Sequence, residues 1–177
     1  MVPSLLLHYY ARQRGPFRSL SDLPHEEAES VLEAIRQRGD GFASQRRPDY
    51  LVIRRELESL LRQRFIDKGG RPTRNTPRYM ILGACDWVRD WYAEGCSLQV
   101  PLARFEPRIV SFTYGDSFPA MRHNDGKPHR GQVFTVGELP SLVEQFGLPQ
   151  QRAEAGGPDR YIEAQVWDDG ALGEWLA

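Results

Sequence analysis

The stretch IVSFTYGDSFPAMR, residues 109–122, contains the pattern that organises the second half of the chain. Ile109, Val110 and Phe112 are β-branched or aromatic, and the hydroxyl residues Ser111 and Thr113 lie on either side of Phe112, which predicts a strand. Gly115 and Asp116 then end that strand with turn residues. Such a stretch is either a strand with a well-formed turn or one wall of a ligand site. In the second interpretation, Tyr114 and Asp116 are the residues to test.

A second strand of the same kind is expected in RYIEAQVWDD, residues 160–169. On a pleated strand Tyr161, Glu163, Gln165 and Trp167 share one face, and the aliphatic residues between them face the core. A carboxyl group between two aromatic rings needs either a hydrogen-bond donor or a raised pKa. The alternative is an ordinary amphipathic strand whose Glu/Gln pair faces solvent. Two aromatic residues on that face favour a covered or ligand-binding surface.

The first half of the chain predicts one strand and two helices. LLLHYY, residues 5–10, reads as a short buried strand that ends in polar aromatic side chains. Apolar residues recur at helical spacing after Pro24, where Ser21 or Asp22 can cap, and again from about Pro48 to Phe65. The remaining short strands are expected at 79–82, 97–100 and 132–135, and short helices at 85–92 and 138–146. This order indicates an α+β fold with a mostly antiparallel sheet.

Length and composition indicate a single globular domain over residues 1–177. Hydrophobic residues make up 40% of the chain and charged residues 27%, as in ordinary globular proteins. No apolar run approaches the roughly 20 residues that span a bilayer, and the N-terminus lacks the features of a secretory signal. The two cysteines, Cys85 and Cys96, are too few for a disulfide framework. We therefore expect a cytoplasmic protein with no membrane partner.

Charge is distributed unevenly along the chain. Between Arg46 and Arg78 there are ten basic residues and four acidic ones, whereas residues 154–177 contain six acidic residues and one basic residue. A basic segment of this kind can follow a phosphate backbone, and Arg54 and Arg55 are then candidate substrate contacts. The alternative is a solvated helix face that is paired with acidic residues elsewhere in the fold.

The order of elements resembles the ADP-ribosyltransferase fold, and specifically the DarT-type DNA ADP-ribosyltransferase toxins. Three segments carry the resemblance, and together they cover most of the chain. LLLHYY, followed by AESVLEAIRQRG, is similar to the family's opening strand and helix. VSFTYGDSFPA is similar to the family's Phe-Thr-Asp-Gly segment, although the order here is Thr-Tyr-Gly-Asp. RYIEAQVWDD occupies the place of the late strand that carries the family's catalytic glutamate.

The resemblance implies a role for each candidate residue. Glu163 would be the catalytic carboxylate, His8 would contact the ribose of NAD, and Arg46 or Arg47 would supply the catalytic arginine. NAD would be the substrate, nucleic acid the target, and a neutralising protein the partner of a toxin. A fixed carboxylate suits this reaction because cleavage of the bond to nicotinamide builds positive charge on the ribose. The remaining candidates for NAD or substrate contacts are Tyr9, Tyr10, Tyr114, Asp116, Gln165 and Trp167.

Two other functions are compatible with the sequence. Asp116 and Glu163 could form the acidic centre of a magnesium-dependent nuclease, although Gln165 stands where a lysine is usual. The protein could also be a non-catalytic module that binds nucleic acid or protein through residues 46–78. The preferred interpretation needs no metal, and His123 and His129 lack a third ligand nearby in the sequence.

Overall fold

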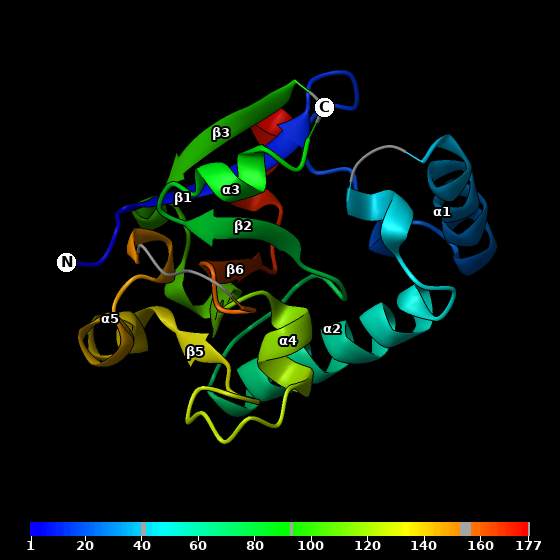
Figure 1. The fold of residues 1–177 in the computed structure, drawn as a ribbon. Coiled ribbons are helices and arrows are strands. Elements are labelled where there is room, and N and C mark those ends of the chain that lie inside the picture. The colour runs from blue at the N-terminus through cyan, green and yellow to red at the C-terminus, as the bar shows by residue number, and fades with distance from the viewer. Residues whose placement is uncertain (40–41, 93, 153–156, 177) are drawn as a thin grey trace.

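The computed structural model describes residues 1–39, 42–92, 94–152 and 157–176, which form one α+β domain around a six-stranded antiparallel sheet (Figure 1). The predicted α+β class with a mostly antiparallel sheet is therefore confirmed. The strands, in sheet order, are β3 (Gly95–Pro101), β1 (Leu5–Ala11), β2 (Arg78–Leu82), β6 (Ile162–Val166), β4 (Val110–Tyr114) and β5 (Phe134–Thr135). No helix within the described ranges combines the length and apolar character that crossing a bilayer requires.

Strand β6 is central although it is the last strand in the chain. It pairs with β2 on one side and with β4 on the other, and all five of its residues are buried. Glu163 is therefore aligned with Ile81 in β2 and with Thr113 in β4. The two stretches that the sequence singles out, 109–122 and 160–169, meet side by side in the middle of the sheet.

Each face of the sheet has its own cover. On one face the aliphatic residues of β6 pack with Leu6 and Phe112 and with helix α5 (Leu139–Phe146). The other face, which carries Glu163, is covered by α2 (Tyr50–Asp67), α3 (Asp86–Arg89) and α4 (Ser117–Arg122). Helix α1 (His25–Arg38) packs against α2 and lies away from the sheet (Figure 1).

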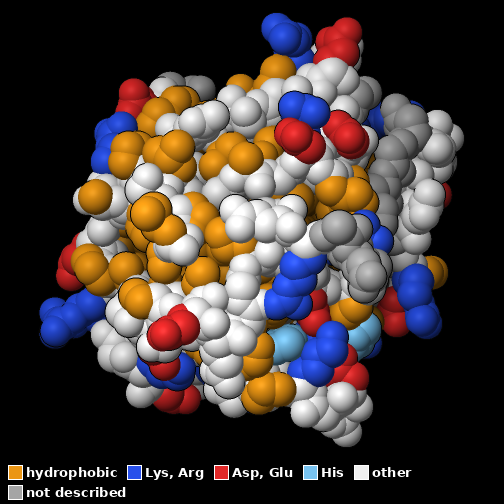
Figure 2. All heavy atoms as spheres, turned by 60° about the vertical axis from the view of Figure 1, so that its left-hand side comes forward, with side chains coloured by type: hydrophobic (Ala, Val, Ile, Leu, Met, Phe, Trp, Pro, Cys, Tyr) orange, Lys and Arg blue, Asp and Glu red, His pale blue; other side chains and the backbone are white. Residues whose placement is uncertain are grey.

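The surface around α5 and the N-terminus is apolar. Figure 2 shows that hydrophobic side chains gather on this side of the molecule. Val2, Val143 and Phe146 are partly buried hydrophobic residues of these segments and pack against the main core. This surface belongs to the face of the sheet opposite Glu163.

The start of α1 differs from the prediction. The residue at its N-cap position is Pro24, not Ser21 or Asp22. Ser19 instead caps a short 3₁₀ turn, Leu20–Asp22, by accepting a hydrogen bond from the backbone N–H of Ser21. Asp22 is held by arginines from another part of the chain, so its carboxylate is not available to cap the helix.

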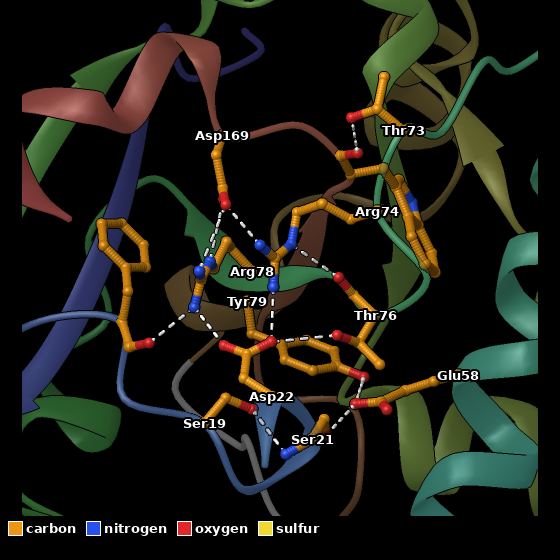
Figure 3. A network of polar contacts seen from close by, with 12 residues as sticks. Ser19, Ser21, Asp22, Glu58, Thr73, Arg74, Thr76, Arg78, Tyr79 and Asp169 are labelled. Carbon is orange, nitrogen blue, oxygen red and sulfur yellow. Dashed lines mark hydrogen bonds and ion pairs between the residues drawn. The ribbon is translucent and has the colours of Figure 1, made fainter. Parts of the chain in front are cut away.

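Those arginines form a clamp that joins three distant segments (Figure 3). Arg74 and Arg78 each pair with both Asp22 and Asp169. The Arg74–Asp22 contact is 2.5 Å and the Arg78–Asp169 contact is 3.0 Å. Arg78 also donates to the carbonyl oxygen of Phe17 over 2.9 Å. Much of the charge of the basic segment is therefore neutralised by acidic residues of the fold. The alternative interpretation predicted this pairing, but it placed the basic residues on a solvated helix face.

We expect the substitution Arg78→Met to lower the free energy of unfolding by about 2–3 kcal/mol, because it removes charge-assisted bonds from two aspartates and a carbonyl. Chemical denaturation at neutral pH measures the change. Arg89→Met is the matched control, since the Arg89 pairs with Asp86 and Asp90 are exposed and worth about 0.5 kcal/mol or less. Equal effects of the two substitutions would contradict the clamp.

Candidate functional site

Glu163 is a buried carboxyl group whose orientation is fixed by hydrogen bonds. Only 7% of the residue is exposed, although it lies on the polar face of β6. Its Oε1 atom accepts a hydrogen bond from the backbone N–H of Ser117 over 3.3 Å and another from Nε2 of Gln165 over 3.1 Å. The predicted alternation along β6 is confirmed, and the alternative of a solvent-facing Glu/Gln pair is wrong because α2, α3 and α4 cover this face.

A ladder of side-chain hydrogen bonds supports Glu163 from within the sheet. Gln165 donates from Nε2 to Thr113 Oγ1 over 3.1 Å and accepts at Oε1 from Ser111 Oγ over 2.9 Å. Trp167 Nε1 donates to Ser111 Oγ over 2.8 Å. Gln165 and Trp167, predicted as substrate contacts, are fully buried. Their polar atoms contact the protein and fix the orientation of the Glu163 carboxyl group.

Asp116 brings a second carboxyl group beside Glu163. Its Oδ1 accepts from the backbone N–H of Phe118 over 2.8 Å, which caps α4, and its Oδ2 accepts from the hydroxyl of Tyr161 over 2.9 Å. Gly115 makes this turn possible, because its φ of 96° is one that other residues rarely adopt. The turn in 109–122 is therefore both a helix cap and the device that places Asp116 next to β6.

The two carboxyl groups influence each other. Burial, together with the negative charge of Asp116, raises the pKa of Glu163 to about 8, against the donors from Ser117 and Gln165. Burial and the Asp116 charge also raise the pKa of the Tyr161 hydroxyl. Glu163 therefore holds a proton at neutral pH and becomes a carboxylate in mildly alkaline solution or beside a positive charge.

Arg46 supplies a cation at the edge of this pair. Its guanidinium lies 4.4 Å from the centre of the Tyr50 ring, which stacks on Phe118 at 5.2 Å. Burial lowers the pKa of Arg46, and the carboxylate of Asp116 is among the groups that oppose this shift. Arg47 is exposed and pairs with Asp49 over 3.5 Å. Of the two arginines considered from the sequence, only Arg46 is shown close enough to Asp116 for the two charges to influence each other.

Arg54 and Arg55 are engaged by the fold. Arg54 donates to Glu58 over 3.0 Å and to the hydroxyls of Ser21 and Tyr50, each over 2.6 Å. Arg55 donates to the carbonyl oxygen of a residue before α1 over 2.9 Å. These side chains connect α2 to its neighbours, so a substrate would have to displace internal bonds to reach them.

His8 lies on the opposite face of the sheet from Glu163. Its Nδ1 atom is 2.9 Å from the carbonyl oxygen of Tyr79, and its Nε2 accepts from the backbone N–H of Phe17 over 2.9 Å. Burial lowers the pKa of His8 to about 4. The ring is therefore neutral, is stacked on Phe17, and has both nitrogens bound to the main chain.

The strands that carry the candidate residues His8, Tyr114 and Glu163 do not present these three side chains to one cleft. Leu7 aligns with Ile81, which aligns with Glu163, which in turn aligns with Thr113, so these four side chains share a face. Because the side-chain period of a strand is two, the neighbouring residues His8 and Tyr114 face the other way.

The remaining aromatic candidates also contact the protein. Tyr114 donates from its hydroxyl to the carbonyl oxygen of Phe146 over 2.7 Å. Tyr9 is on the Glu163 face, but its hydroxyl accepts from the backbone N–H of Cys85 over 2.8 Å. Tyr10 is partly buried on the opposite face and stacks with His8. None of the three presents a ring to the carboxyl pair.

Sequence reasoning missed three contributors to the site. The backbone N–H of Ser117 orients Glu163, the Tyr161 hydroxyl holds Asp116, and Tyr92 is close enough to Arg46 to influence its pKa. A signal for Ser117 was present, because an aspartate that caps a short helix places the following N–H groups beside it. The sequence around Tyr92 contains no comparable signal, because Tyr92 precedes β3, an edge strand that β1 and β2 separate from β6.

Two surface cavities lie elsewhere. A cavity of about 590 Å³ is bordered by Arg71, Arg104, Asp168 and neighbouring residues, and one of about 310 Å³ by residues of α4 and His123. Neither is lined by Glu163. Across the described ranges, no three or more His, Cys, Asp or Glu side chains are grouped so that they could hold a metal ion.

Comparison of the sequence with models of protein families and with curated proteins found no match, and neither did comparison of the structure with solved structures. The functional interpretation of the site therefore depends on its own chemistry.

Proposed function

We propose that the protein cleaves the bond between nicotinamide and ribose in NAD and transfers the ADP-ribose group to an acceptor, as the resemblance to ADP-ribosyltransferases implies. The observation that carries the proposal is the Glu163 carboxyl group, which is buried, oriented by two donors and paired with Asp116. Perturbed carboxyl groups of this kind are typical of catalytic sites.

The chemistry of the two carboxyl groups suits this reaction. As the bond from the ribose C1′ to the nicotinamide ring nitrogen breaks, its electron pair leaves with nicotinamide and positive charge develops on the ribose. A carboxylate that is costly to bury is stabilised strongly by that charge. Once Glu163 has released its own proton to solvent, a nucleophile forms a bond to C1′ and the nucleophile's proton passes to the Glu163 carboxylate. A pKa of about 8 is close to what a general base needs at neutral pH.

Arg46 has a role that does not involve bond breaking. Its guanidinium lies over the Tyr50 ring and within electrostatic reach of Asp116, and there it would hold the negatively charged pyrophosphate of NAD. Nucleic acid is the acceptor class that the resemblance implies. The non-catalytic alternative has weaker support, because Arg54, Arg55 and Arg78 of the basic segment are occupied by internal contacts.

Nicotinamide release tests the proposal directly. We expect purified protein to bind NAD in calorimetry and to release nicotinamide at a rate that single-stranded DNA or RNA increases, with label from NAD appearing on the nucleic acid. EDTA should leave this reaction unchanged. The proposal is wrong if the protein neither binds NAD nor releases nicotinamide. Degradation of nucleic acid that stops with EDTA would favour the nuclease instead.

A further inference from the structure

An aromatic cluster lies next to the carboxyl pair and reaches the surface. Trp87 of α3 is 42% exposed, which is unusual for so large an apolar side chain. Its ring meets Trp91 edge-on with 4.7 Å between centroids. Both tryptophans also approach Tyr161, at 6.4 and 6.5 Å. These ring contacts connect the solvent-exposed Trp87 to the buried Tyr161, which directly precedes β6.

Tyr161 connects this cluster to the candidate site. Its ring contacts the tryptophans, and its hydroxyl donates to Oδ2 of Asp116. Glu163 is two residues further along β6 and lies on the same face as Tyr161. A planar group that rests on Trp87 is therefore separated from the carboxyl pair by a single aromatic ring.

Arg160 adds a positive charge to the exposed ring. Its guanidinium carbon lies 4.2 Å from the centre of Trp87, and its Nε donates to the carbonyl oxygen of Gly157 over 3.2 Å. In the part of the chain that the structure describes, no carboxylate lies within ion-pair distance of Arg160. An exposed tryptophan with an unneutralised guanidinium matches a flat ring that carries a phosphate.

We propose that Trp87 and Arg160 form a stacking subsite for one nucleotide of a substrate. The base stacks on the part of the Trp87 ring that the Arg160 guanidinium leaves exposed, and this guanidinium pairs with the adjoining phosphate. This inference rests on the proposed function for the identity of its ligand. The nucleotide can come from two sources, the adenosine monophosphate half of NAD or a nucleotide of the acceptor strand, and both offer the same chemistry.

A second tryptophan provides a matched control. Trp175 also lies near an arginine, with the Arg104 guanidinium 5.4 Å from its ring, but Arg104 is neutralised by Glu174 over 2.7 Å. This pair belongs to the other face of the sheet, where Trp175 packs against the main core. Trp175→Ala therefore removes a similar ring without touching the subsite.

Binding of small probes tests the subsite. Wild type, Trp87→Ala, Trp87→Phe and Trp175→Ala are titrated with AMP and with a short single-stranded oligothymidylate, and each dissociation constant is measured by calorimetry. Because base stacking on an aromatic ring is worth roughly 1–3 kcal/mol, Trp87→Ala should weaken the binding of one of the probes by about 5- to 150-fold. Trp87→Phe should retain most of the affinity, and Trp175→Ala should bind as wild type does.

The outcomes distinguish the two possible sources of the nucleotide. They also distinguish the failure of the subsite from the failure of the proposed reaction. A loss confined to AMP assigns the subsite to NAD, and a loss confined to the oligonucleotide assigns it to the acceptor. The subsite is overturned if wild type binds neither probe, or if Trp87→Ala binds both as tightly as wild type. Binding through Trp87 without any release of nicotinamide from NAD would overturn the proposed reaction and leave the subsite standing.

Discussion

Replacing Glu163 with glutamine is expected to lower kcat/KM for nicotinamide release by a factor of about 10²–10⁴, because the variant lacks both the negative charge and the general base. Glutamine has nearly the same shape, and its carbonyl oxygen can still accept from the N–H of Ser117 and from Gln165. The loss therefore measures the carboxylate and not the packing. Steady-state assays of free nicotinamide provide the measurement.

The pH dependence identifies which form of Glu163 acts. If the carboxylate is required, wild-type kcat/KM should rise as the pH increases through about 8, where the buried group loses its proton. The residual activity of Glu163→Gln should show no such rise. Glu106→Gln, at an exposed carboxyl on the border of the larger surface cavity, is the control and should behave as wild type. A Glu163→Gln variant with wild-type turnover would remove Glu163 from the mechanism.

The sequence predicts the strands of this fold better than their arrangement. Period-two alternation in 109–113 and 160–169 is a local property, so it identifies Thr113 and Glu163 as residues on the polar side of their strands. The order of strands in the sheet depends on contacts between segments that are far apart in the chain. Nothing local indicates that the last strand, β6, inserts between β2 and β4.

The same limit explains the outcome for the candidate site. The alternation of side chains along each strand can be read from the sequence. Which side chains of neighbouring strands share a face depends on the register between the strands. His8 and Tyr114 are each one residue away from positions that share a face with Glu163, and that offset places them on the opposite face. Arg78 has no evident ion-pair partner in the sequence, because Asp22 and Asp169 come close to it only in the folded chain. The Arg54–Glu58 pair, in contrast, is an i,i+4 contact on a helix and could have been predicted.

The buried position of Glu163 has a consequence for stability. A carboxyl group in an unfolded chain loses its proton near pH 4.3, whereas burial and Asp116 hold the folded pKa near 8. Between these values the folded protein binds a proton that the unfolded chain has released. Raising the pH therefore favours unfolding in this window, and the stabilising effect of the retained proton is lost as the pH passes through about 8.

Glu163→Gln removes this effect, because its amide stays neutral at every pH. The variant's free energy of unfolding should therefore increase relative to wild type by about 1.4 kcal/mol for each pH unit inside the window, or about 3–4 kcal/mol between pH 5 and 8. Urea denaturation of both proteins at several pH values measures the difference, and Glu106→Gln should show no comparable trend. A difference that does not change with pH would mean that Glu163 is ionised in the folded protein at pH 5, and the proton that the proposed mechanism moves would then have to reside on another group.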